Sequence, residues 1–140
     1  MNDGVRALFA HKVPYNPRLT KIGDWERDSG FIAGEELIRE GVTAIFAHND
    51  MMALGVLDYC NVNGIEVGKD IRLIGFDNRE ISTVCRPRLS TVALPLFEIG
   101  QTATRVMLDI LDGNGAPPAG AIVLDCAIIE RESTTGVNGN

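Results

Sequence analysis

Short apolar runs alternate with longer segments of mixed polarity along this chain. The runs are rich in branched aliphatic residues and are flanked by glycine, asparagine and aspartate, which is typical of buried strands. Strands are therefore expected at 19–22, 44–47, 71–74 and 122–130. Their alternation with helical segments indicates an α/β fold with a parallel sheet.

Helices are predicted at 5–10, 29–40, 51–63 and 96–112. Ser29 or Asp28 can cap the second of these, and Asn49 or Asp50 the third. In the last, apolar residues recur every three or four positions, so one apolar stripe faces a core. A turn rich in proline and glycine is expected at 113–120.

Three predicted strand ends or loops carry residues suited to binding a neutral, polyhydroxylated ligand. They are Trp25, Asn49 and Asp77. An indole can stack on the apolar face of a sugar, while amides and carboxylates pair with its hydroxyls. Ligands of open parallel sheets bind beyond the carboxyl ends of the strands, so one shared rim is expected. Each residue also has an ordinary interpretation: Trp25 as a packing residue, Asn49 as a helix cap and Asp77 as an Asx-turn residue.

Composition and charge narrow the possible functions. The chain has 140 residues, enough for one core, and its net charge of −6 argues against direct binding of nucleic acid. No segment has the length of a membrane span and no signal peptide is recognised, so a cytoplasmic protein is expected. The three cysteines, Cys60, Cys85 and Cys126, have spacings that suggest neither a disulfide framework nor a metal site. No catalytic motif is present, so we expect a binding protein without a cofactor rather than an enzyme.

An ordered set of motifs points to a family. Phe46-Ala47-His48-Asn49-Asp50 continues to Gly55, Ile74-Gly75-Phe76-Asp77-Asn78 follows, and Glu130-Arg131-Glu132-Ser133-Thr134 comes near the end. Together they resemble the lactose/galactose repressor (LacI/GalR) family of transcription regulators. The resemblance implies a three-layer, parallel-sheet lobe of the periplasmic-binding-protein-like type I fold. It also implies that Trp25 stacks on a sugar-like effector, that Asn49 lies at the cleft, and that Asp77 is the main polar acceptor.

The resemblance further implies how the chain is organised and what it binds. Residues 1–140 would be the C-terminal portion of the effector domain, without the helix-turn-helix head and most of the N-terminal lobe. DNA would then be a partner only through that head, with no membrane partner, and the helix at 96–112 would leave an apolar face uncovered. The third helix is apolar nearly all round, and such a helix needs two buried faces.

One face of that third helix should cover the sheet. The other is expected to form a two-fold homodimer surface, made of Leu54, Leu57, Asp58, Val84 and Cys85. Loops of the same chain could cover that face instead. A periplasmic-type sugar-binding protein and a receiver-like domain are the alternative protein classes.

Overall fold

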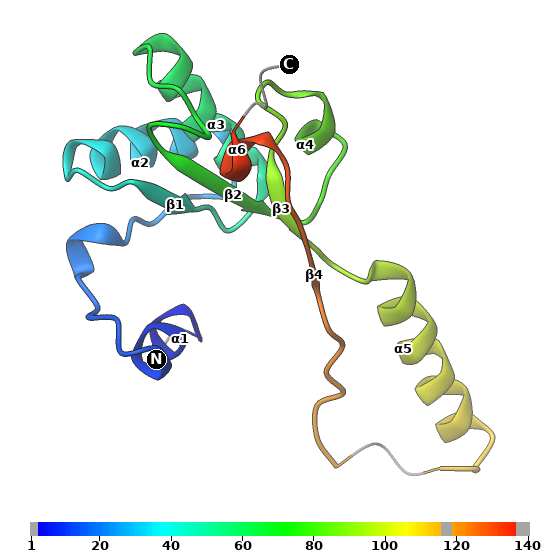
Figure 1. Cartoon of the computed structure of the whole chain (residues 1–140). Coiled ribbons are helices and arrows are strands. Elements are labelled where there is room, and N and C mark those ends of the chain that lie inside the picture. The colour runs from blue at the N-terminus through cyan, green and yellow to red at the C-terminus, as the bar shows by residue number, and fades with distance from the viewer. Residues whose placement is uncertain (1–2, 116–118, 137–140) are drawn as a thin grey trace.

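Helices and strands alternate along the chain in the computed structural model, which describes residues 3–115 and 119–136. The elements are α1 (Asp3–Ala10), a 3₁₀ turn η1 (Pro17–Leu19), α2 (Arg27–Arg39), β1 (Ala44–Phe46), α3 (Asp50–Val62), β2 (Arg72–Phe76), α4 (Ile81–Val84), β3 (Ser90–Ala93), α5 (Leu96–Leu111), β4 (Ala127–Ile129) and α6 (Glu132–Thr135) (Figure 1). The expected helices are confirmed with small shifts of their ends. Part of the turn expected at 113–120 lies outside the described residues.

The sheet has the strand order β1-β2-β3-β4. β1, β2 and β3 are parallel, with Ile45 beside Leu73 and Ile74 beside Ser90. β4 runs antiparallel to β3, because the chain leaves the sheet after β3, forms α5 and returns along the same strand. A parallel sheet is therefore confirmed at β1, β2 and β3, although β3 lies outside the strand ranges expected from the sequence. The last expected strand, β4, is an antiparallel edge.

Helices α2 and α3 pack closely against each other through glycines. A Cβ atom built on Gly55 would lie 1.9 Å from the carbonyl oxygen of Arg27, and one built on Gly30 would lie 2.1 Å from that of Met52. No side chain larger than hydrogen fits at either position. The core lies beneath this helix pair and includes Ile45, Ala53, Val56, Leu57, Cys60 and Leu73.

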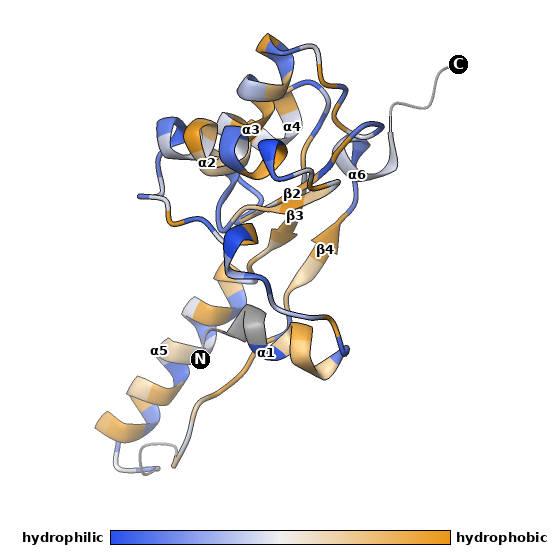
Figure 2. Cartoon of the chain, turned by 90° about the vertical axis from the view of Figure 1, so that its left-hand side faces the viewer, coloured by the Kyte–Doolittle hydropathy of each residue, from blue (hydrophilic) through white to orange (hydrophobic). Residues whose placement is uncertain are grey.

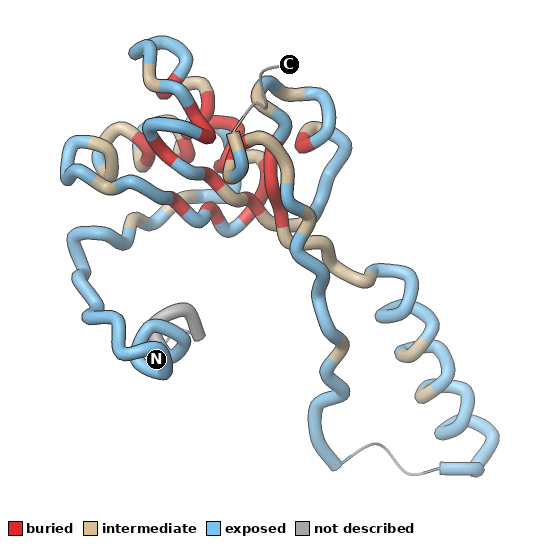
Figure 3. The backbone as a smooth tube through the Cα atoms, in the orientation of Figure 1, coloured by how far each residue is buried: buried red, intermediate tan, exposed pale blue. Residues whose placement is uncertain are grey.

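The opposite face of the sheet is more open (Figure 3). Phe46 is 52% exposed there, with its ring near those of His48 and Phe76 at centroid distances of 5.3 and 6.4 Å. The burial alternates along β1 and β2, because successive side chains of a strand point to opposite faces. The face of the sheet that α2 and α3 cover is thus the better buried one, and α6 also contacts β2 and β3.

Several local predictions are wrong. No strand was expected at Ser90–Ala93, where β3 lies, and the strand expected at 122–130 is limited to Ala127–Ile129. The segment 19–22 forms no strand: η1 ends at Leu19, and Ile22 is 97% exposed. Helix α2 begins earlier than predicted, with Glu26 as its N-cap residue, so that Asp28 and Ser29 lie inside the first turn. The Ser29 hydroxyl instead accepts a hydrogen bond from the Asp24 amide and donates one to the Glu26 carbonyl.

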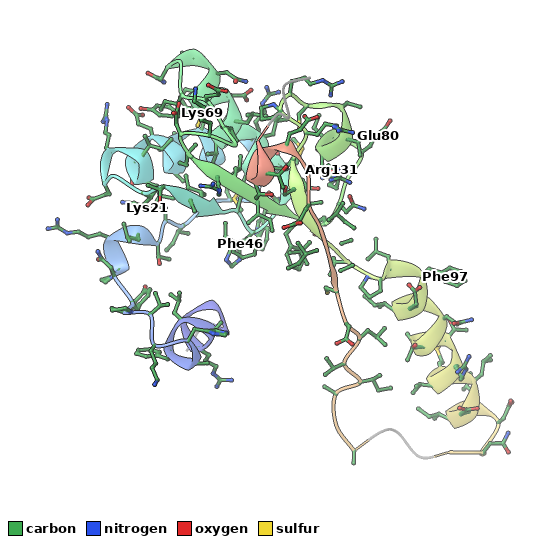
Figure 4. All side chains as sticks on the ribbon, viewed as in Figure 1. Lys21, Phe46, Lys69, Glu80, Phe97 and Arg131 are labelled. Atoms are coloured by element: carbon green, nitrogen blue, oxygen red, sulfur yellow. The ribbon has the colours of Figure 1, made fainter. Side chains whose placement is uncertain are left out.

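Helix α5 projects away from the sheet (Figure 1). None of its residues is buried, and Figure 2 shows apolar positions both on the helix and along the chain that returns to β4. Helix and returning segment flank an apolar groove of about 730 Å³, lined by residues that include Ile99, Ala103, Val106, Met107, Ile122 and Leu124. Phe97, 77% exposed, lies on the other side of the helix (Figure 4). The predicted uncovered apolar face is present.

Candidate functional site

Asn49 follows β1 and caps helix α3. Its side-chain oxygen accepts a hydrogen bond of 2.7 Å from the Met52 amide, and its side-chain nitrogen donates one of 2.8 Å to the Trp25 carbonyl. The side chain is 7% exposed. Both ends of this amide are therefore engaged within the protein, and its observed role is to join the start of α3 to the loop that carries Trp25.

Trp25 precedes helix α2 and is held in an unusual backbone conformation, with a φ of 74°. The residue is 61% exposed. The turn around it is closed by Asp24, whose carboxylate accepts a 3.0 Å hydrogen bond from the Glu26 amide. Contact with the Ser29 hydroxyl, and then with that amide, lowers the pKa of Asp24 below its ordinary value. A rigid turn thus presents an aromatic side chain to solvent.

Asp77 follows β2, at the same sheet edge as Asn49 because β1 and β2 are parallel neighbours. Its φ is 101°, and that of Asn78 is 53°. The Asp77 amide donates to the carbonyl of Val92 on β3 at 2.9 Å. The amide of Arg79 donates to the carboxylate of Asp50, the first residue of α3, at 2.7 Å. The Asp77 loop and the Trp25 loop are thus both tied to the N-terminus of one helix.

Asp50 is a member of this site that the sequence suggested only as an alternative cap. It is fully buried, and its carboxylate accepts hydrogen bonds from Arg79 and from the Thr91 hydroxyl. Burial raises the pKa of Asp50 above its ordinary value, against the two hydrogen bonds, which lower it. Gly75 leaves room for this carboxylate, because a Cβ atom at that position would lie 2.3 Å from one of its oxygens.

The residues predicted for a dimer surface separate into two groups. Leu54 and Leu57 are 9% and 3% exposed, because α2 and the sheet cover α3 from both sides. Asp58 forms an ion pair with Arg27 of α2, and Cys85 is half-buried. Val84 is 57% exposed. The structure therefore assigns the two leucines to packing within the chain, and the dimer stays a prediction with less apolar surface than expected.

Comparison with known proteins places this geometry in a family. A family model described as a periplasmic binding protein-like domain matches residues 4–134. The chain belongs to the periplasmic binding protein-like domain family.

This periplasmic binding protein-like domain is similar to bacterial transcription regulators. It is 36% identical over 132 residues to the HTH-type transcriptional repressor CytR of Escherichia coli (strain K12), covering 93% of this chain and 38% of the repressor. It matches the transcriptional regulator CelR, solved as a cellobiose complex, with a TM-score of 0.82 and 30% identity over 91% of this chain and 39% of CelR. It matches the Lac repressor dimer bound to operator and the anti-inducer ONPF with a TM-score of 0.77 and 29% identity, over 93% of this chain and 45% of that one.

These likenesses confirm the predicted resemblance to the LacI/GalR family and the predicted fold class. The domain spans about two fifths of the length of CytR. No helix among residues 3–115 and 119–136 is long and apolar enough to cross a membrane.

Proposed function

We propose that this chain is the effector-sensing part of a LacI-family transcription regulator, and that a sugar-like small molecule binds at the sheet edge that carries Trp25 and Asp77. The observation that carries this proposal is the network through Asn49 and Asp50, which ties both loops to the start of α3. An exposed indole beside fixed polar groups suits a ligand with an apolar face and a ring of hydroxyls. The cellobiose complex of CelR supports the same class of ligand.

Within the proposal, Trp25 stacks on the ligand and Asp77 accepts hydrogen bonds from its hydroxyls. Asn49 acts mainly through Trp25, since both ends of its amide are engaged in the protein. The chain carries out no chemical reaction. Its role is to change the operator affinity of a cytoplasmic regulator, as expected from its likeness to repressors.

The proposal includes an organisation in which residues 1–140 are the C-terminal portion of a two-lobed effector domain. DNA is bound by a helix-turn-helix head elsewhere in the regulator, and two copies associate as a homodimer. The operator-bound dimer of the Lac repressor supports this arrangement. A periplasmic sugar-binding protein is the alternative, and the similarity to CytR favours the regulator.

The test is calorimetric titration of the chain with cellobiose and a panel of monosaccharides. Asp77→Ala should weaken binding more than Asn49→Ala, because each unpaired ligand hydroxyl costs about 1–3 kcal/mol. Trp25→Ala should also weaken it. Asp109→Ala, which removes an exposed carboxylate from α5, is the matched control and should leave binding unchanged. Equal affinity of wild type and Asp77→Ala for a sugar that binds would refute the proposed site.

A further inference from the structure

The loop after β2 holds two adjacent residues with left-handed backbone conformations, Asp77 and Asn78. Such conformations persist in non-glycine residues only where the surroundings enforce them. Here three consecutive amides are each fixed by a different acceptor. Asp77 donates to the Val92 carbonyl at 2.9 Å, Asn78 to the Thr91 hydroxyl at 3.2 Å, and Arg79 to Asp50 at 2.7 Å.

Two of these three bonds depend on the buried carboxylate of Asp50. One carboxylate oxygen accepts the Arg79 amide directly. The other accepts the hydrogen of the Thr91 hydroxyl at 2.7 Å, which leaves the Thr91 oxygen free to accept the Asn78 amide. Both oxygens of Asp50 must therefore act as acceptors, which an amide side chain cannot do. Gly75 leaves the space that the second oxygen occupies.

The charges around Asp50 are arranged on several elements. Asp77 raises the pKa of Asp50 by repulsion and Arg131 lowers it by attraction, but burial has the largest effect and raises it. Arg131 lies before α6, and its guanidinium donates to the Asn78 side chain at 2.8 Å and to the Leu89 carbonyl at 2.7 Å (Figure 4). The loop is thus held from both sides, by α3 and by the segment that enters α6.

A buried carboxylate often contributes less to folding stability than a well-packed apolar group of similar size. Its value lies in fixing one conformation. We propose that Asp50 is a positioning residue, which sets the backbone geometry of the loop from which Asp77 reaches a ligand. The ligand half of this inference rests on the proposed function, whereas the positioning half concerns the loop alone.

The experiment compares amide hydrogen exchange at Asn78 and Arg79 in the wild-type chain, Asp50→Asn, Thr91→Val and Thr91→Ser, by NMR. Asp50→Asn replaces one of the two acceptor oxygens by a donor nitrogen, so exchange should be at least tenfold faster at Asn78, at Arg79 or at both, while the Ala53 amide inside α3 exchanges at its wild-type rate. Thr91→Val should speed exchange at Asn78, and Thr91→Ser, which keeps the hydroxyl, should restore it. Unchanged exchange at residues 78 and 79, or an equal acceleration at Ala53, would overturn the positioning role. Should Asp50→Asn fail to fold, the threonine pair still tests the link from Asp50 through Thr91 to the Asn78 amide, and unchanged exchange at Asn78 in Thr91→Val would overturn it.

A titration of the same variants with cellobiose tests the ligand half of the inference separately from the positioning half. If the wild-type chain binds cellobiose, Asp50→Asn should weaken binding at least tenfold and Thr91→Ser should bind as the wild type does. Wild-type affinity in Asp50→Asn would refute the link to the ligand. One portion of a two-lobed site should bind weakly, so the titration extends to millimolar sugar. If none of the variants, including the wild type, binds cellobiose or a monosaccharide there, the proposed function fails, while the exchange data still decide whether Asp50 positions the loop.

Discussion

Replacing Gly55 by alanine should force helices α2 and α3 apart. The added Cβ atom would lie 1.9 Å from the Arg27 carbonyl oxygen and 2.6 Å from the Phe31 nitrogen, where ordinary contact begins at 3.4 Å. Both obstacles are backbone atoms of α2, so no side-chain rotation relieves them. The helices must separate locally by about 1.5 Å, and gaps of about 0.5–1 Å already forfeit a quarter to a half of the dispersion energy of a contact.

The gains from Gly55→Ala are smaller than this loss. A buried methyl group contributes about 0.8 kcal/mol and removal of a helical glycine about 0.5–1 kcal/mol. Overpacking a close-packed core typically costs a net 1–3 kcal/mol. We expect a net destabilisation of about 2 kcal/mol and a lower melting temperature, by about 5–8 °C for a chain of this size.

Urea unfolding followed by circular dichroism measures the effect of Gly55→Ala. Gly100→Ala is the matched control, because a Cβ atom there, in the middle of α5, has nothing within 4 Å. It should leave the unfolding midpoint unchanged or raise it. The change at Gly55 should also alter Trp25 fluorescence, since Trp25 precedes α2 while its carbonyl is bonded to the cap of α3. An unfolding midpoint equal to that of the wild type would refute the close glycine contact.

Other consequences can be measured on the same chain. Asn49→Ala should cost about 1–2 kcal/mol in urea unfolding, since it removes a helix cap, whereas Asn49→Ser should keep most of that stability; equal losses in both would argue against the capping role. Burial raises the pKa of Cys60 to about 11, so about a thousandth of this thiol is ionised at pH 8, and iodoacetamide should modify exposed Cys126 first. Mass spectrometry that finds Cys60 modified before Cys126 would contradict the buried position. With a net charge of −6, the chain should give no salt-sensitive anisotropy change with random-sequence duplex DNA, and such a change would contradict the assignment of DNA binding to another segment.

Elements with a strong local pattern were predictable, including β1, β2 and the helices α3 and α5, whereas β3 has no such pattern and was missed. Helix α5 follows from its own periodicity and forms although none of its residues is buried. The segment 19–22 has no paired neighbour among the described residues, so Leu19 ends the 3₁₀ turn η1 and residues 20–22 do not join the sheet. Helix α2 begins at Arg27 because Ser29 bonds to the turn before it, a contact that residue preferences alone do not reveal.

The shared sheet edge of Asn49 and Asp77 was predictable, because both residues follow parallel strands. The strand expected before Trp25 does not form, and Trp25 is joined to that edge by the hydrogen bond from Asn49 to its carbonyl. The long-range contacts of Asp50 were not predictable. Asp50 bonds to Arg79 and Thr91, which lie 29 and 41 positions further along the chain. No local sequence pattern indicates such contacts. Asn49 was predicted as a helix cap and, from the family resemblance, at a ligand cleft. The structure confirms the cap and adds the bond to the Trp25 carbonyl, and the cleft role stays a prediction.

Because β3 and β4 are antiparallel neighbours, the segment between them, which contains α5, can be deleted without breaking the sheet. Ala93 and Ala127 stand directly opposite each other in the register, so the two points where the chain leaves and re-enters the sheet are neighbours. A two-residue Asn-Gly turn, the commonest way to join antiparallel strands, can bridge that gap without shifting either strand. The α2–α3 pair, the sheet and the polar network around Asp50 would all remain in such a shortened chain. The same geometry lets evolution exchange whatever lies between these two alanines while the sheet edge with Trp25 and Asp77 stays intact.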